Sequence, residues 1–281
     1  MRPVVWDFWG VPIHGYGLMI VIGFLLALVV TTRLARQRGL PDVLYDLGMV
    51  MLLCGIVGGR TFYYLENYRG DFAAKPLWAF FKIWEGGLVF YGGAIGGLVG
   101  GFAFLRWKRL PLAAAFDITS VGVPLGMAFG RLGCFLNGCC FGRLCGEEFP
   151  LGVRFPDTSA PVEHQIRHGW IDAGDPVAPV HPVQLYQATH DFLLFLLLWW
   201  YVGRGKAPRG AGIPLLWVLY GIGRFFLEGL RGDNPSTFSG LTISQNVSIV
   251  MASAFAMVLI WLYWRELRSP AGDSENPKKV V

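Results

Sequence analysis

The stretch GMAFGRLGCFLNGCCFG, residues 126–142, closes an apolar run that begins near residue 113 and decides how this chain folds. The run is long enough for a transmembrane helix, yet it contains Arg131, whose guanidinium keeps its proton in proteins. At bilayer depth this charge costs roughly 2.5–3.5 kcal/mol on insertion scales unless an anionic group meets it. The partner of Arg131 is therefore the question that leads to function.

The composition of the whole chain agrees with a membrane protein. Its 281 residues are 54% hydrophobic and only 15% charged, which is too apolar for a soluble domain of this size. Apolar runs of about the 20 residues that a ~30 Å hydrocarbon core requires recur seven times. They cover residues 16–35, 44–65, 87–107, 113–136, 183–202, 211–230 and 244–264. The sequence therefore predicts an all-α integral membrane protein with about seven transmembrane helices.

Basic residues follow the odd-numbered runs and predict the orientation. They are Arg33, Arg36, Arg38, Arg106, Lys108, Arg109, Arg204, Lys206, Arg209, Arg265, Arg268, Lys278 and Lys279. The positive-inside rule places them in the cytoplasm, which puts the N-terminus outside and the C-terminus inside. The net charge of +5 arises largely from these loops, so it does not indicate nucleic-acid binding.

Three segments between and after the runs have their own character. Residues 141–182, rich in Pro, Gly, Asp and His, predict a small extracytoplasmic head between the fourth and fifth spans. This head is too short to be an independent domain, so residues 1–268 are expected to form one transmembrane domain. Residues 76–84, with several aromatic side chains, predict a short interfacial helix that serves as an anchor or a lid. Residues 269–281 are polar and turn-rich and predict a disordered cytoplasmic tail.

The third run carries glycines in two interleaved small-xxx-small series, which let two helices approach closely. These are Gly92, Gly93, Gly96, Gly97, Gly100 and Gly101. Tight helix packing is the preferred interpretation, and a lipid cavity lined by backbone is the alternative.

Ionisable residues recur inside the predicted spans, where packing does not require them. They are Asp46, Arg60, Asp117, Arg131, Arg224 and Glu228, with Arg231 just beyond. Arg224 and Glu228 are four residues apart and could neutralise each other, and Asp117 could pair with an arginine of another helix. An excess of positive charge still remains near the outer ends of the spans. It predicts an anionic ligand, for which a lipid phosphate is the most available candidate.

Four of the five cysteines cluster near the end of the fourth span. Cys134, Cys139, Cys140 and Cys145 have the spacing C-x4-C-C-x4-C, which lacks the paired C-x2–4-C knuckles of zinc sites, so no metal is expected. A disulfide involving Cys145 stays open as an alternative, and small buried thiols are the default.

Residues 130–138, GRLGCFLNG, followed by Gly142, resemble the signature of bacterial phosphatidylglycerol:prolipoprotein diacylglyceryl transferases. Four further segments match that family in order. They are residues 13–19 (IHGYGLM), 58–60 (GGR), 181–186 (HPVQLY) and 220–228 (YGIGRFFLE), the last leading to Arg231. The matches extend over nearly the whole chain.

The resemblance implies an enzyme of the bacterial inner membrane whose active site faces the extracytoplasmic leaflet. It would transfer the diacylglyceryl group of phosphatidylglycerol to the lipobox cysteine thiol of a preprolipoprotein. This reaction forms a thioether, releases glycerol phosphate and is the first step of lipoprotein maturation. The implied partners are phosphatidylglycerol, the signal peptide of the preprolipoprotein and membrane lipids, with no cofactor and no nucleic acid. A monomer is expected.

The resemblance also implies the site residues. Arg131 and Arg224 match the family's essential arginines and would clamp the phosphate, and Tyr91 and Tyr220 are expected in the catalytic set. The substrate-binding set implied by matching positions is Tyr16, His14, Arg60, Asp117, Asn137, Gly142, Glu228, Arg231 and His181.

Some positions depart from the family pattern. The family commonly has a histidine, often proposed to activate the thiol, where this chain has Tyr91, and a tyrosine with a pKa near 10 is a poor base at neutral pH. Asn and Glu are common at the positions of Cys134 and Cys139, and Glu at that of Gln187. The alternative hypothesis is a divergent paralogue that binds or transports phospholipid without catalysis.

Overall fold

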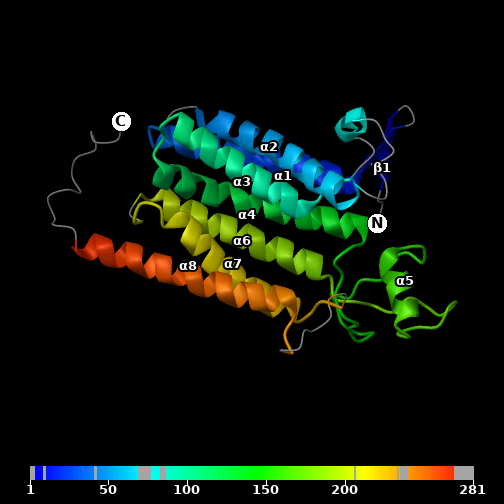
Figure 1. Ribbon diagram of the computed structural model, residues 1–281. Coiled ribbons are helices and arrows are strands. Elements are labelled where there is room, and N and C mark those ends of the chain that lie inside the picture. Colours follow the sequence, from blue (N-terminus) through cyan, green and yellow to red (C-terminus); the bar gives the residue numbers. More distant parts are fainter. Residues whose placement is uncertain are drawn as a thin grey trace. The chain divides into compact units, whose positions relative to one another are not determined.

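The computed structural model describes residues 4–8, 11–40, 43–68, 77–82, 87–205, 207–232, 234 and 240–268. Each of the seven predicted apolar runs coincides with one long helix (Figure 1). These helices are α1 (Gly15–Gln37), α2 (Val43–Glu66), α3 (Phe90–Trp107), α4 (Leu112–Asn137), α6 (Val183–Gly203), α7 (Gly212–Glu228) and α8 (Ile243–Arg268). The prediction of a helical membrane protein is confirmed.

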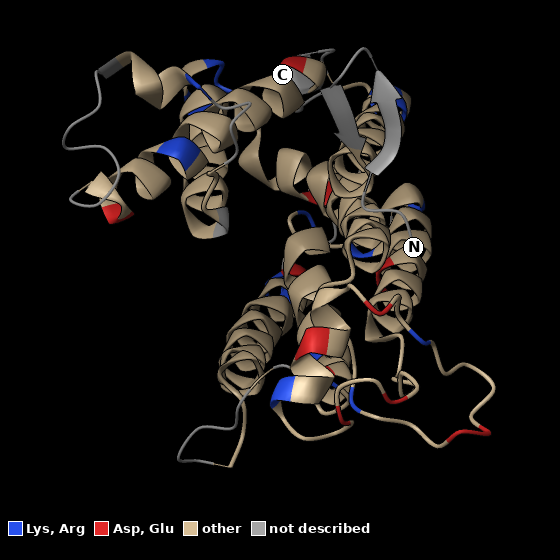
Figure 2. Cartoon of the chain, turned by 90° about the vertical axis from the view of Figure 1, so that its right-hand side faces the viewer, with Lys and Arg blue, Asp and Glu red and all other residues tan. Residues whose placement is uncertain are grey.

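Four of these helices are long and apolar enough to cross a membrane by length and composition: α1, α2 from residue 45, α4 and α8. The helix α7 has only 17 residues and is therefore about 26 Å long, slightly less than a ~30 Å hydrocarbon core. The count of seven spans and the orientation of the chain stay predictions. Figure 2 shows that Lys, Arg, Asp and Glu are sparse along the helices.

Two short elements accompany the helices. An antiparallel hairpin of β1 (Val4–Phe8) and β2 (Val11–His14) precedes α1 and was not predicted, with Phe8 paired to Val11 next to the turn. Its residues are largely β-branched or aromatic, a composition that favours strands. The 3₁₀ helix η2 (Leu77–Phe81) lies within the predicted interfacial segment.

The chain divides into two compact units, and each is described by itself. The smaller one, residues 31–115, contains α2, η2 and α3. Its two long helices pack through glycine: a Cβ at Gly92 would clash with the carbonyl oxygen of Gly58, and one at Gly96 with that of Cys54. Only Gly permits such backbone contact, so the prediction of tight helix packing is confirmed.

The larger unit comprises residues 1–30 and 116–281. In it α7 packs against both α6 and α8 (Figure 1). Its interior contains fully buried apolar side chains, among them Leu198 on α6 and Leu216 on α7. This packing fixes the ends of α6, α7 and α8, where the polar side chains described below gather.

The predicted head is a compact structure between α4 and α6, built around the short helix α5 (Ala160–Arg167). Phe141, Phe155, Val162 and Val180 form its small apolar core. The side chain of Gln165 is fully buried and makes two hydrogen bonds with the main chain of residue 178. The location of the head outside the membrane and the single-domain organisation of residues 1–268 stay predictions. The predicted tail, residues 269–281, lies outside the described residues.

Candidate active site

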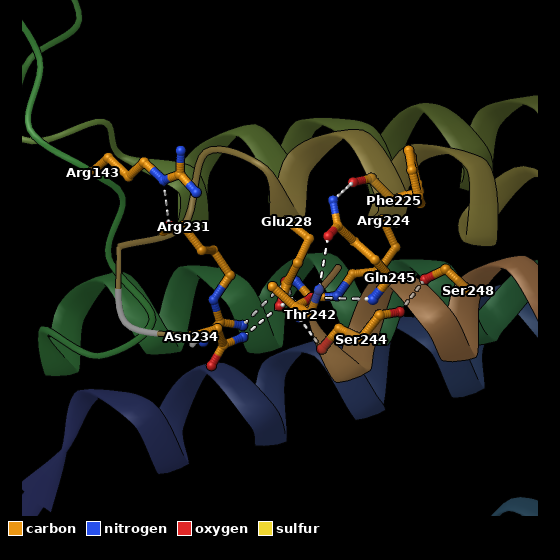
Figure 3. Close-up of polar contacts among 10 residues, drawn as sticks. All are labelled: Arg143, Arg224, Phe225, Glu228, Arg231, Asn234, Thr242, Ser244, Gln245 and Ser248. Carbon is orange, nitrogen blue, oxygen red and sulfur yellow. Dashed lines mark hydrogen bonds and ion pairs between the residues drawn. The ribbon is translucent and has the colours of Figure 1, made fainter. Parts of the chain in front are cut away.

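Glu228, the last residue of α7, organises the polar cluster of the larger unit (Figure 3). The residue is 1% exposed, and its Oε2 accepts ion pairs from Arg224 Nη2 at 2.6 Å and Arg231 Nη1 at 3.8 Å. Its Oε1 accepts hydrogen bonds from Thr242 Oγ1 at 3.2 Å and from Asn234 Nδ2. One buried carboxylate thus holds two guanidiniums beside the start of α8.

The start of α8 is fixed by a capping box, a local pattern that the sequence itself encodes. The main-chain N–H of Gln245 donates to Thr242 Oγ1 at 3.2 Å, and the N–H of Thr242 donates to Gln245 Oε1 at 3.0 Å. Gln245 Nε2 also donates to the carbonyl of Phe225 at 3.3 Å, and Arg224 Nη2 to Ser244 Oγ at 3.4 Å (Figure 3). The first turn of α8 therefore helps to set the direction of Arg224.

Two guanidiniums of the cluster have N–H donors that no described residue uses. Arg224 Nη1 is buried and has no hydrogen-bond partner among the residues that the structure describes. Arg131 is half-buried on α4 and, within the same described ranges, makes no hydrogen bond or ion pair. The two positive charges are close enough to repel each other. Unused N–H groups on neighbouring cations are a binding arrangement for an anion.

Arg131 interacts electrostatically with the phenol of Tyr220 on α7 and with the carboxylate of Asp191 on α6. Asp191 is 1% exposed, its Oδ1 lies 3.1 Å from His190 Nδ1, and its Oδ2 is buried without a hydrogen-bond partner among the described residues. The ring of His190 is 6.4 Å from that of Tyr220. Among the residues that the structure describes, the carboxylates of Asp191 and Glu228 interact with the guanidiniums of Arg131, Arg224 and Arg231. Three positive charges thus stand against two negative ones in this described set.

Sequence reasoning missed Asp191, although a signal for it exists. Gln184, Gln187 and Asp191 are spaced three and four residues apart, which places them on one face of α6, and all three are buried. Both polar atoms of the Gln187 side chain lack a hydrogen-bond partner within the described chain. A polar stripe on an otherwise apolar helix indicates an internal polar site.

Tyr16, in the first turn of α1, lies against the end of α4. A Cβ at Gly133 would be 3.1 Å from Tyr16 Cδ2 and 3.2 Å from its main-chain oxygen, so a side chain there would displace the tyrosine. Tyr16 is 42% exposed and interacts electrostatically with Cys134, Cys139 and Arg131. The structure thus brings Tyr16, Arg131, Tyr220, Arg224 and Glu228 into one region of the larger unit.

The thiols after α4 belong to the same region. Hydrogen bonds with Cys134 and Cys139 lower the pKa of Cys140, and the nearby charges of Arg231 and Arg131 lower it further. By contrast, burial raises the pKa of Cys145, which lies in the head. The thiol of Cys140 therefore lies within electrostatic range of Arg131 and Arg231, and that of Cys134 within range of Arg131.

Gly142 and His181 join the head to the segment of Arg231. The N–H of Gly142 donates to the carbonyl of His181 at 3.0 Å, and Gly142 bridges with Arg231 on its other side. A Cβ at Gly142 would clash with the His181 carbonyl, so this position requires Gly for close approach. The Nδ1 atom of His181 lies 3.4 Å from Tyr186 Oη, and the His181 ring packs edge-to-face with the Phe149 ring at a centroid distance of 4.8 Å. Gly142 and His181 therefore hold the main chain that surrounds Arg231 in place.

Other predicted site residues lie at element ends or far from the arginines. Asn137 is exposed at the end of α4, and His14 is exposed at the end of β2. Asp117 accepts hydrogen bonds from the N–H groups of Gly210 and Gly212, both at 2.8 Å. It lies 14 residues before Arg131 on α4, which corresponds to about 20 Å. Asp117 fixes the turn before α7.

Arg60 and Tyr91 belong to the smaller unit. Arg60 is 3% exposed and donates to the carbonyls of Ala79, Phe80, Lys82 and Gly87 at 2.8 to 3.2 Å. Its guanidinium therefore ties α2 to η2 and to the residues just before α3. Tyr91 is 73% exposed near the start of α3.

Comparisons with known proteins identify the family. The family described as "Prolipoprotein diacylglyceryl transferase" matches residues 3–261. A protein of Clostridium tetani named "Phosphatidylglycerol--prolipoprotein diacylglyceryl transferase" is 32% identical over 89% of this chain and 93% of its own length. Proteins with the same name from Psychrobacter arcticus (33% identical, 94% of each chain) and Corynebacterium diphtheriae (30% identical, 89% of this chain and 88% of the relative) are also similar. The resemblance inferred from the sequence is confirmed, and the chain belongs to the prolipoprotein diacylglyceryl transferase family.

Proposed function

We propose that this protein transfers the diacylglyceryl group of phosphatidylglycerol to a cysteine thiol of a prolipoprotein, forming a thioether and releasing glycerol phosphate. The names of its relatives supply the reaction and both substrates. The observation that carries the proposal in this chain is the pair of guanidiniums with unused donors, Arg131 and Arg224.

The reaction displaces a phosphate from a glycerol carbon, so negative charge grows on the departing oxygen. Guanidiniums bind phosphate oxygens with paired N–H donors, and the attraction increases as that charge develops. Arg224 offers Nη1 to the phosphate because Glu228 and Ser244 hold its Nη2. The mutual repulsion of Arg131 and Arg224 in the free enzyme is relieved when an anion lies between them. Both effects favour the transition state over the free site.

The remaining residues of the cluster take supporting roles in this proposal. Tyr220, which interacts with Arg131, and Tyr16, which is partly exposed beside Gly133 of α4, contact the lipid headgroup. Glu228 sets the positions of Arg224 and Arg231 and does not touch the lipid, because its oxygens are occupied by protein donors. Asn137 and His14 are left as contacts for the signal peptide that carries the lipobox cysteine.

The site is proposed to face the extracytoplasmic leaflet of a bacterial inner membrane, in a monomer with seven spans. The cluster gathers where α4 and α7 end and where α6 and α8 begin, whereas Arg204 and Arg209 occupy the connection at the other end of α6 and α7. Since basic loops favour the cytoplasm, the polar cluster belongs to the opposite side. The alternative of a non-catalytic lipid-binding protein is not favoured, because the relatives are named as transferases.

The test is a transfer assay with purified protein, phosphatidylglycerol and a lipobox peptide, followed by mass spectrometry of the peptide. Arg131→Ala and Arg224→Ala are each expected to lower kcat by about 10²–10³, the size expected when a group that stabilises developing charge is removed. Arg154→Ala, which removes an exposed arginine of the head, is the matched control and should stay within twofold of the parent. Full activity in either cluster variant would remove the phosphate clamp from the mechanism.

A further inference from the structure

Three cysteine side chains meet where α4 ends. Cys134 lies in the last turn of the helix, Cys139 and Cys140 follow it, and all three sulfur atoms lie within 4.8 Å of one another. Each residue is half-buried. The spacing in the sequence predicted no metal, because it lacks the paired C-x2–4-C segments of zinc sites. The turn after Asn137 nevertheless brings the three sulfurs together.

The turn is a Schellman motif, which explains the meeting of the sulfurs. Gly138 has φ +74°, its N–H donates to the carbonyl of Phe135 at 3.3 Å, and the N–H of Cys139 donates to the carbonyl of Cys134 at 3.1 Å. The hydrogen bond from the N–H of Cys139 to the carbonyl of Cys134 places the two side chains next to each other. Gln184 Nε2 donates to the Cys139 carbonyl at 2.8 Å and ties the turn to α6.

Cys140 completes the group through an unusual backbone conformation. Its φ of +59° lies in the left-handed region, which few residues other than Gly adopt. This conformation directs the chain back so that its sulfur joins the other two. The arrangement is therefore built by a helix cap and one strained residue rather than by the knuckles of ordinary zinc motifs.

Three sulfurs in this arrangement suit a soft cation. Zinc–thiolate bonds of about 2.3 Å place sulfur atoms about 4 Å apart, so closure from 4.8 Å or less requires only small side-chain rotations. A disulfide would use two of the sulfurs and leave the third, and a bond between the adjacent Cys139 and Cys140 would need a Cα separation shorter than disulfides usually span. A metal ion uses all three equally.

The charge around the group also fits a divalent cation. Three thiolates and Zn²⁺ have a net charge of −1, and the guanidiniums of Arg131 and Arg231 are near enough to Cys140 to offset it. No further His, Cys, Asp or Glu joins the three sulfurs among the residues that the structure describes. Zinc prefers four ligands, and catalytic sites keep one position open for water or substrate.

We propose that Cys134, Cys139 and Cys140 bind one Zn²⁺ ion through three thiolates and leave its fourth position for the cysteine thiol of the prolipoprotein. The second half of this inference rests on the proposed transferase function. A thiol that binds Zn²⁺ loses its proton, which supplies a thiolate without a general base and compensates for the tyrosine at position 91.

The step balances without an oxidant or reductant. The substrate thiol releases its proton to water on binding the metal, and its sulfur attacks the glycerol carbon that carries the phosphate. The new carbon–sulfur bond forms as the carbon–oxygen bond breaks, and that electron pair leaves with the phosphate as glycerol phosphate. Arg131, which interacts electrostatically with both Cys134 and Cys140, places the leaving phosphate beside the attacking sulfur.

Metal content tests the site independently of activity. Purified full-length protein, equilibrated with zinc and freed of excess, should contain one zinc per chain by mass spectrometry of the metal. Cys134→Ser, Cys139→Ser and Cys140→Ser should each weaken zinc binding by at least 100-fold, while Cys54→Ser and Cys145→Ser, which alter thiols outside the group, should not. The proposal would be overturned if the wild-type protein contained no zinc or contained copper instead of zinc. It would also be overturned if the three variants bound zinc as the wild type does, or if two of the three cysteines formed a disulfide.

The open position is tested on the wild-type protein, so that misfolding of a variant cannot imitate the result. Cobalt in place of zinc should give thiolate-to-metal charge-transfer absorption, and a lipobox peptide should shift the ligand-field bands, whereas the same peptide with serine for cysteine should not. Bands unchanged by the cysteine peptide would overturn the substrate half. If no thioether forms while zinc and the spectral shift are both present, the transferase proposal fails and the metal site stands.

Discussion

Arg60 and Arg131 are both arginines inside apolar helices, and the structure gives them opposite environments. Arg60 is 3% exposed, and its donors are occupied by four main-chain carbonyls of its own compact unit. Arg131 is half-buried and makes no hydrogen bond or ion pair with any described residue, while Arg224, a second cation, lies close by. The donors of Arg60 are thus used by its own unit, whereas Arg131 is the arginine that we propose binds the lipid phosphate.

The difference shows how to tell a structural charge from a functional one inside a membrane protein. A buried guanidinium is costly unless its donors find partners. When the chain supplies the partners, substitution should damage the fold. When the donors have no partner in the protein and a like charge lies nearby, burial of the guanidinium is explained by binding of a ligand. Substitution should then lower activity without lowering stability.

The largest expected effect tests this contrast at Arg131. Arg131→Ala should lower kcat by about 10²–10³ without lowering the midpoint of thermal unfolding, because no hydrogen bond within the described chain is lost. Arg131→Lys should recover only part of the activity, since an ammonium cannot form the paired bonds of a guanidinium. The measurements are the transfer assay and thermal unfolding in detergent. A lower midpoint of unfolding for Arg131→Ala would show that Arg131, like Arg60, stabilises the fold, and would contradict the contrast between the two arginines.

The opposite pattern is expected at Arg60. Arg60→Ala leaves buried carbonyls without their donor, and each such group costs roughly 1–3 kcal/mol when unsatisfied. The midpoint of unfolding should fall clearly, while kcat per folded molecule stays within threefold of the parent. Loss of activity in a fully stable Arg60→Ala protein would instead place Arg60 at the lipid.

A smaller effect is expected at Asp117, which caps the turn before α7. Asp117→Asn keeps one acceptor for the N–H groups of Gly210 and Gly212 and loses the charge, so stability should fall by about 1 kcal/mol. The apparent KM for phosphatidylglycerol should not change, because Asp117 is about 20 Å along α4 from Arg131. A raised KM with unchanged stability would contradict the structural role.

The smallest effect is expected at Tyr91. Its side chain is 73% exposed, and a neutral phenol is a weak acceptor for the proton of a thiol. Tyr91→Phe should therefore retain transfer activity within twofold across pH 6–8, read from the rate of peptide modification. A large loss that Tyr91→His restores would show that this position handles the proton and would weaken the case for thiol activation by metal.

The sequence predicted the helices well because their signals are local. Runs of about 20 apolar residues coincide with all seven long helices, and the Gly-rich third run predicted the contact that Gly58, Gly92 and Gly96 make. The hairpin before α1 was missed, since two short strands provide little periodicity. Asp191 was missed because the apolar residues of α6 outnumber the polar stripe that it shares with Gln184 and Gln187.

The sequence by itself determined the membrane class, the helix positions, the family and the arginines worth testing, because length, apolarity and local motifs are written along the chain. Only the tertiary structure decided which charges are satisfied. Glu228 proved to hold Arg224 and Arg231, Asp117 to hold a turn, and Arg60 to hold carbonyls. The meeting of Cys134, Cys139 and Cys140 was likewise decided by a helix cap. The physical reason is that hydrogen-bond partners and sulfur–sulfur distances depend on how distant or turning segments pack, which spacing along one chain does not specify.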